Sequence, residues 1–110
     1  MEREKSEVFM RLTEKERKAI TDYFKKNFSK EDHLWLFGSR VHDEKKGGDI
    51  DLYIETKLTA QEAVRGELTF VSDLWRAIGE QRIDIVLNLK HSKTQLPIYS
   101  VARTQGIQLI

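Results

Sequence analysis

Residues 49–54, Asp-Ile-Asp-Leu-Tyr-Ile, and residues 82–87, Arg-Ile-Asp-Ile-Val-Leu, decide the fold because polar and apolar side chains alternate along both. Side chains on a strand point to opposite faces in turn, so Asp49 and Asp51 share one face and the apolar residues between them share the other. Asp84 stands in the same relation to its own apolar neighbours. If the two strands lie side by side with their apolar faces together, three carboxylates converge on the opposite face.

Three carboxylates in one place indicate a metal site. Carboxylates packed closely repel one another unless cations hold them. Sites made only of oxygen ligands suit Mg²⁺ or Mn²⁺. Ions held in this way commonly serve phosphoryl chemistry, so the sequence predicts an Mg²⁺ site, with Mn²⁺ as the alternative ion.

Composition bounds the class of protein. The chain has 110 residues, of which 34% are charged and 39% hydrophobic, as expected for one small, soluble domain. The formal net charge of +1 gives no reason to expect direct binding to nucleic acid or a membrane. Disulfides and thiolate metal sites are excluded because the chain has no cysteine. The N-terminus lacks the apolar region of a signal peptide, and the longest apolar run, residues 34–37, is too short for a bilayer; the prediction is a cytoplasmic protein.

The first half of the chain predicts a short leader followed by a helix and a strand. Residues 1–12 read as a flexible leader, and residues 13–110 as a single domain. Thr-Glu-Lys-Glu at residues 13–16 is a capping box that opens a helix ending near residues 27–30. Residues 34–37 form a buried strand that ends at Gly38, where a turn or short helix begins before a polar loop at 42–48.

The second half repeats the helix and strand pattern. A second capping box, residues 59–62, opens a helix that ends near Gly79. Gly66 inside it leaves room for a kink or a break, because glycine costs about 1 kcal/mol against alanine there. Pro97 opens a last helix, and residues 107–110 form a short strand or a tail. The expected fold class is α/β (α+β): a small mixed β-sheet with helices mainly on one face.

The order of motifs resembles a known signature. Residues 36–40, Leu-Phe-Gly-Ser-Arg, are followed after a short spacer by Asp-x-Asp at residues 49–51 and by a third acid, Asp84, on a later strand. Together they resemble the signature of the DNA polymerase β-like nucleotidyltransferase superfamily, and the short chain looks most like the minimal nucleotidyltransferases (MNT) of HEPN–MNT pairs. The resemblance covers roughly residues 15–106, although only these three elements are diagnostic. It implies the polymerase β-like nucleotidyltransferase fold.

The resemblance assigns roles to six residues. The residues that would bind the nucleotide are Gly38, Ser39 and Arg40. The residues that would be both catalytic and metal-binding are Asp49, Asp51 and Asp84. A glycine at a strand end lets the backbone approach a phosphate, and a serine at a helix start offers a hydroxyl and free N–H groups. The alternatives are a turn glycine, a helix cap without ligand, and an arginine in a surface salt bridge. Arg82, beside the third acid, is expected to pair with one of the carboxylates.

The implied activity is Mg²⁺-dependent transfer of NMP, with AMP from ATP expected, to a hydroxyl of a protein partner. No acceptor-binding segment is evident, and the acidic face also carries Tyr53 and Val86, with Trp35 as a third candidate, so a partner or a second copy is expected to cover it. MNT proteins pair with a helical HEPN protein. In the better understood pairs HEPN is an RNase toxin and MNT is its antitoxin, which transfers AMP to a tyrosine of the toxin. Whether activity needs the partner stays open. The alternative is a non-catalytic antitoxin that blocks a HEPN partner by complex formation; a small-molecule transferase would need extra helices.

Overall fold

The computed structural model describes residues 12–38 and 49–110 of the chain. The elements in these segments are α2 (Glu14–Asn27), β1 (His33–Phe37), β2 (Ile50–Thr56), α4 (Ala60–Ile78), β3 (Ile83–Leu89), α5 (Pro97–Gln105) and β4 (Ile107–Gln108). The predicted leader up to residue 11 and the predicted turn and loop at 39–48 lie outside the described residues. The other predicted helices and strands are all present.

The helices begin where the sequence places their caps. The Thr13 hydroxyl accepts the Glu16 N–H at 3.0 Å, and the Glu16 carboxylate accepts the Thr13 N–H at 3.0 Å. The same reciprocal pair joins Thr59 and Glu62 at the start of α4, at 3.2 and 3.0 Å. Each capping box satisfies N–H groups that no helical carbonyl can reach. Both predicted capping boxes are therefore confirmed.

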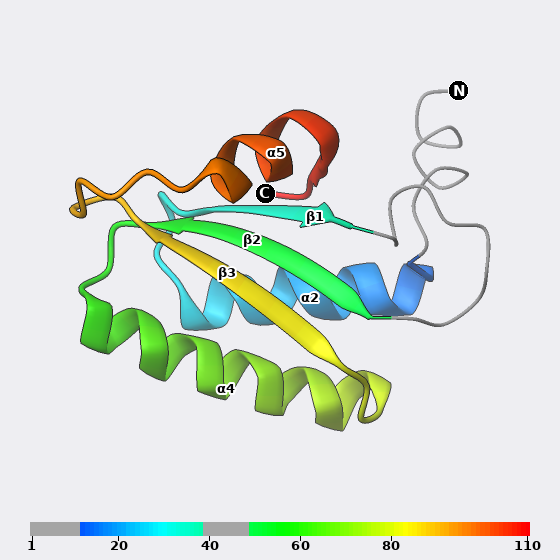
Figure 1. Ribbon diagram of the computed structural model, residues 1–110. Coiled ribbons are helices and arrows are strands. Elements are labelled where there is room, and N and C mark those ends of the chain that lie inside the picture. Colours follow the sequence, from blue (N-terminus) through cyan, green and yellow to red (C-terminus); the bar gives the residue numbers. More distant parts are fainter. Residues whose placement is uncertain (1–11, 39–48) are drawn as a thin grey trace.

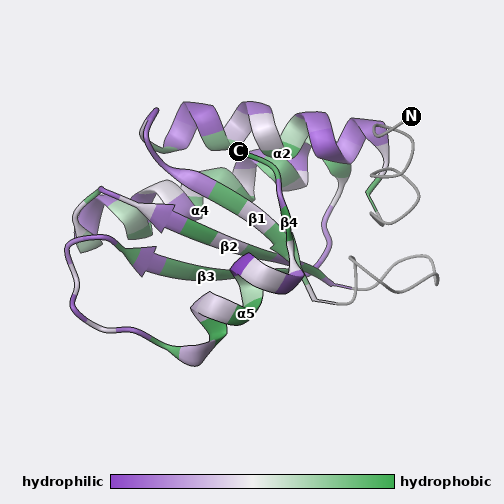
Figure 2. Ribbon diagram, turned by 90° about the horizontal axis from the view of Figure 1, so that it is seen from above, coloured by the Kyte–Doolittle hydropathy of each residue, from purple (hydrophilic) through white to green (hydrophobic). Residues whose placement is uncertain are grey.

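The sheet is mixed, with the order β3-β2-β1-β4. Strands β2 and β3 run parallel, while β1 pairs antiparallel with both β2 and β4. Two helices, α2 and α4, cover one face, and α5 lies on the other (Figure 1). Figure 2 shows the order of the strands from the α5 side. The prediction of an α+β domain with a mixed sheet is confirmed, and the C-terminal segment forms a short strand.

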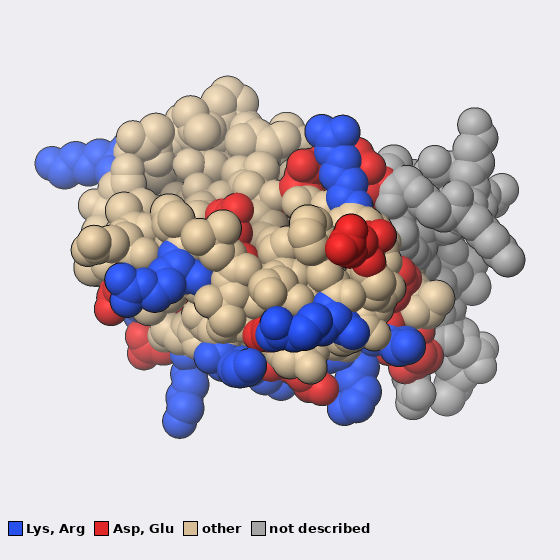
Figure 3. Space-filling view, turned by 90° about the horizontal axis from the view of Figure 1, so that it is seen from below, with Lys and Arg blue, Asp and Glu red and all other residues tan. Residues whose placement is uncertain are grey.

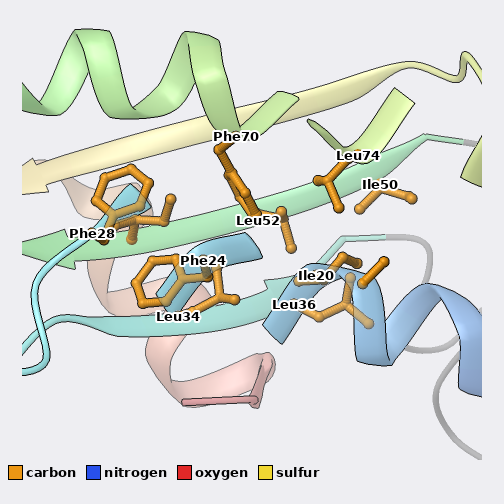
Figure 4. Close-up of a cluster of buried hydrophobic side chains, with 11 residues drawn as sticks. Ile20, Phe24, Phe28, Leu34, Leu36, Ile50, Leu52, Phe70 and Leu74 are labelled. Atoms are coloured by element: carbon orange, nitrogen blue, oxygen red, sulfur yellow. The ribbon is translucent and has the colours of Figure 1, made fainter. Parts of the chain in front are cut away.

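The core lies between the sheet and the two helices α2 and α4. Apolar side chains of β1 and β2 point toward this layer, and Ile20, Phe24, Phe70 and Leu74 of the helices pack on them (Figure 4). The strand residues in this core are Leu34, Leu36, Ile50, Leu52 and Ile54, all fully buried. Because alternate residues of β2 enter the core, the residues between them are fixed on the opposite face.

Helix α4 does not break at Gly66, so of the two outcomes that the sequence left open the break is excluded. The helix is continuous from Ala60 to Ile78, and Gly66 is buried within it. A Cβ at this position would lie 2.8 Å from the Asn27 carbonyl oxygen and 3.5 Å from the Phe28 ring. The glycine therefore allows the end of α2 to approach α4 closely, and this packing offsets the lower helix propensity.

The acidic face carries a helix of the chain itself, α5, although the sequence led us to expect a partner or a second copy there. Tyr53 is fully buried on that face. Its ring centroid lies 5.2 Å from that of Trp35 and 5.6 Å from that of Tyr99 in α5. Val86 and Ala102 also belong to this second, smaller cluster. The aromatic residues of β1 and β2 are thus covered by the chain's own last helix. They give no reason to invoke an outside partner.

Charged side chains of both signs are mixed over the surface seen from the side of α2 and α4, without a large patch of one sign (Figure 3). Among the described residues, none of the helices has the length and apolar character needed to cross a bilayer.

Candidate functional site

Two of the predicted acids are direct neighbours across the parallel strands. The register of β2 and β3 places Asp51 beside Asp84, and Ile50 beside Ile83. Residues that are partners in a sheet share a face, so both carboxylates point away from the core that holds the isoleucines. The prediction that these two acids share a face is confirmed.

Asp49 joins this pair through Arg82. The Arg82 Nε lies 3.6 Å from Asp49 Oδ2 and 3.4 Å from Asp84 Oδ2. The expected ion pair of Arg82 is therefore present, and it links two carboxylates rather than one. The arginine side chain is 72% exposed, so this ion pair contributes little to stability and is easily opened.

The pKa of the Asp51 carboxyl group reflects the closeness of the three acids. Its carboxyl group has a raised pKa, first because the group is partly buried and then because the negative charges of Asp84 and Asp49 oppose its ionisation. The positive charge of Arg82 acts in the opposite direction. A cation between the carboxylates would relieve the same repulsion.

Gly38 packs directly against the site. It ends β1 with a φ of +79°, a backbone conformation that favours glycine. A Cβ built on it would overlap Asp51 Oδ2 and lie 3.0 Å from Asp51 Cγ. The residue is therefore required to leave room for the Asp51 carboxylate, a role that the sequence motif did not reveal. Ser39 and Arg40, the other two residues predicted to bind the nucleotide, lie outside the described residues.

The donor chemistry fits a hard divalent cation, because three carboxylates supply only oxygen ligands. The side chains are not arranged around an ion: within residues 12–38 and 49–110, no three His, Cys, Asp or Glu side chains converge as a ligand set. Arg82 supplies the positive charge between Asp49 and Asp84 instead. Binding of an ion would require this exposed arginine to move and the carboxylates to turn.

A second polar cluster on the same face was not predicted from the sequence. Glu55, which follows Tyr53 by two residues, is buried and accepts the Tyr53 hydroxyl at 2.7 Å. Lys90 and Arg103 approach its carboxylate at 3.1 and 3.3 Å. Burial alone would raise the pKa of Glu55, but these hydrogen bonds and charges outweigh it and lower the pKa. Glu55 continues the two-residue spacing of Asp51 and Tyr53, and this spacing was the signal that could have placed Glu55 on this face.

This cluster is structural. Asn88 donates to the Tyr53 hydroxyl at 2.9 Å, and Arg103 ties α5 to β2 through Glu55. Since each carboxylate oxygen of Glu55 already has a cationic partner, the cluster fixes α5 over the sheet.

No family model matches this chain, and no curated protein sequence matches it.

Proposed function

We propose that this chain is a Mg²⁺-dependent nucleotidyltransferase, with the polymerase β-like fold, that acts in the cytoplasm. The observation that carries the proposal is the register of the parallel strands, which sets Asp51 beside Asp84 on the face away from the core. Asp49 lies at the same end of the sheet, joined to Asp84 through Arg82. Three acids on two adjacent strands could hold the metal ions that assist phosphoryl transfer in two-metal sites.

Asp49, Asp51 and Asp84 would hold Mg²⁺ or Mn²⁺, which supplies charge neutralisation for the triphosphate and for the attacking and leaving oxygens. Gly38 keeps the space beside Asp51 free. Ser39 and Arg40 would bind the phosphates, as the sequence motif implies.

In the proposed reaction the oxygen of an acceptor hydroxyl bonds to the α-phosphorus of ATP, and the bond from that phosphorus to pyrophosphate breaks. The hydroxyl proton passes to a carboxylate, for which Asp84 is the best placed because it is the most exposed of the three acids. The products are an AMP-modified acceptor and pyrophosphate.

The acceptor rests on the resemblance alone: we propose a hydroxyl of a helical HEPN-type protein, for which this chain would be the antitoxin. The test is incubation of the chain with labelled ATP, Mg²⁺ and such a partner. We expect label on the partner with the wild type and none with the double variant Asp49→Asn, Asp51→Asn. Asp22→Asn on the exposed side of α2 is the control for a lost charge. Transfer that persists in the double variant would rule out this site.

One observation favours the non-catalytic alternative, in which the chain neutralises its partner by complex formation. Arg82 already pairs with Asp49 and Asp84, so these acids also fit a purely structural ion-pair cluster. Neutralisation of the partner in a growth assay separates the two proposals. The double variant would fail there if transfer is needed and would neutralise normally if binding suffices.

A further inference from the structure

Arg82 is the cation of the candidate site. Its Nε lies 3.6 Å from Asp49 Oδ2 and 3.4 Å from Asp84 Oδ2, so one guanidinium group lies between two carboxylates. Among the residues that the structure describes, no other lysine or arginine forms an ion pair with Asp49, Asp51 or Asp84. Arg82 is therefore the chain's own counter-ion for these acids.

The backbone of Arg82 is fixed, whereas its side chain is free to turn. Its carbonyl accepts the Ile50 N–H at 3.0 Å, directly before β3 begins at Ile83. The side chain is 72% exposed, and ion pairs in contact with water contribute about 1 kcal/mol or less. The guanidinium can therefore leave the carboxylates without any change in the strands and at little cost in free energy.

The acids outnumber this cation. When ionised, Asp49, Asp51 and Asp84 carry three negative charges against the single positive charge of Arg82, so the site as it stands repels a triphosphate. Once divalent cations neutralise the carboxylates, Arg82 loses its partners and is repelled by the cations. The same neutralisation removes the negative charge that keeps a triphosphate away. Arg82 is thus released under the conditions in which the site accepts an anion.

We propose that Arg82 binds the triphosphate, exchanging its two carboxylate partners for phosphate oxygens when the metal-bound nucleotide enters. This inference rests on the proposed function. A phosphate that shares a cation with a carboxylate lies one ion away from it, and so within reach of a side chain that already touches the carboxylates. A guanidinium suits the exchange because its planar fork of N–H donors fits carboxylate and phosphate oxygens alike.

The exchange gives Arg82 opposite effects on the two ligands. Without triphosphate, the guanidinium competes with a metal ion for Asp49 and Asp84 and weakens metal binding. With triphosphate present, the same group donates charge-assisted hydrogen bonds to the phosphates and strengthens binding of the metal complex. Arg82 therefore couples the two ligands, so that each raises the affinity of the site for the other. This coupling disfavours a site that holds metal without nucleotide.

Isothermal titration calorimetry with two probes, Mn²⁺ alone and the manganese complex of inorganic tripolyphosphate, tests the inference. Arg82→Gln should bind Mn²⁺ alone about threefold more tightly, because a weak competing ion pair is gone. It should bind the complex about tenfold more weakly, because hydrogen bonds to a charged partner are lost. Arg65→Gln is the matched control: this exposed arginine lies on α4, across the sheet from the acids, and both affinities should equal those of the wild type. Circular dichroism verifies that both variants are folded.

The outcomes separate this inference from the proposed function. A wild type that binds neither probe would refute the metal site and the role of Arg82 together. A wild type that binds both probes keeps the metal site, and the role of Arg82 is then overturned if Arg82→Gln shifts both affinities in the same direction or leaves either one unchanged. A structural ion pair alone would not produce shifts of opposite sign.

Discussion

Among single residues, Gly38 links the end of β1 to the acidic site. Gly38→Ala should destabilise the fold by about 1–2 kcal/mol because its φ is +79°. It should also weaken Mn²⁺ binding, because the new Cβ would displace the Asp51 carboxylate. Urea denaturation and Mn²⁺ titration measure the two effects. Gly79→Ala is the control: its φ is +90°, but no atom lies within 4 Å of its Cβ position, so it should lose stability and keep the ion. Unchanged Mn²⁺ binding in Gly38→Ala would show that the glycine does not set Asp51.

Ionised Asp51 should lower the stability of the folded chain, although the proposed metal site needs its carboxylate. Burial and the neighbouring Asp84 and Asp49 raise its pKa in the folded chain, so the native state binds the proton more tightly than the unfolded state does. Folding stability from this group is present at acid pH and is lost as pH rises through the raised pKa. Asp51→Asn should therefore have a higher Tm than the wild type at neutral pH, an advantage that disappears in acid, and should not bind Mn²⁺. Glu80→Gln, an exposed change of the same charge, is the control for a lost carboxylate. A lower Tm for Asp51→Asn at neutral pH would contradict the argument.

Between elements, Asp73 is the polar group that joins α4 to α2. Its buried carboxylate accepts Asn27 Nδ2 at 3.1 Å and Lys26 Nζ at 3.3 Å, and it pairs with Arg76 on its own helix. Burial would raise its pKa, but these partners outweigh burial and lower it. Its contribution to stability is therefore present above the ordinary pKa of aspartate and is lost as pH falls through the lowered value.

Asp73→Asn should destabilise the protein by about 2 kcal/mol at neutral pH, because hydrogen bonds to a buried charge are lost. The difference from the wild type should shrink in acid, where both lack the charge. Asp22→Asn removes a carboxylate from the exposed pair with Lys18 and should change stability by less than about 0.5 kcal/mol. Urea denaturation at both pH values measures these differences, and an equal loss for the two variants at neutral pH would show that burial of Asp73 adds nothing.

The elements were predictable because their signals are local. Capping boxes, alternation and Pro97 each act within a few residues, and each marked a helix or strand that the structure contains. The packing between elements was not predictable in this way. Gly66 was read as a weak point because only its own helix was considered, whereas its reason is the approach of Asn27 from α2. The burial of Tyr53 likewise depends on α5, which returns to the sheet more than forty residues later.

For the molecule as a whole, the site was predictable only as far as strand periodicity reaches. Alternation put Asp49 and Asp51 on one face and Asp84 on one face of its own strand. Whether the faces coincide depends on the parallel register, which the sequence does not state and the structure supplies. The position of Arg82 between two acids also needs both strands in place. The Asp49–Arg82 and Asp51–Asp84 contacts join residues more than thirty positions apart, beyond the range of any local pattern.

The whole-molecule consequence is that a divalent cation should stabilise folding. An ion that binds only the folded state at ten times its Kd adds about 1.4 kcal/mol, which for a chain of this size raises Tm by about 6 °C. We expect this rise with MgCl₂ over NaCl of matched ionic strength, and no rise in the Asp49→Asn, Asp51→Asn variant. Arg82→Gln should enlarge it, because the guanidinium that now pairs with Asp49 and Asp84 no longer competes with the ion. Thermal melts followed by circular dichroism measure all three proteins. An equal rise in the double variant would place the ion elsewhere, and a smaller rise in Arg82→Gln would mean that the arginine helps to hold the ion instead of competing with it.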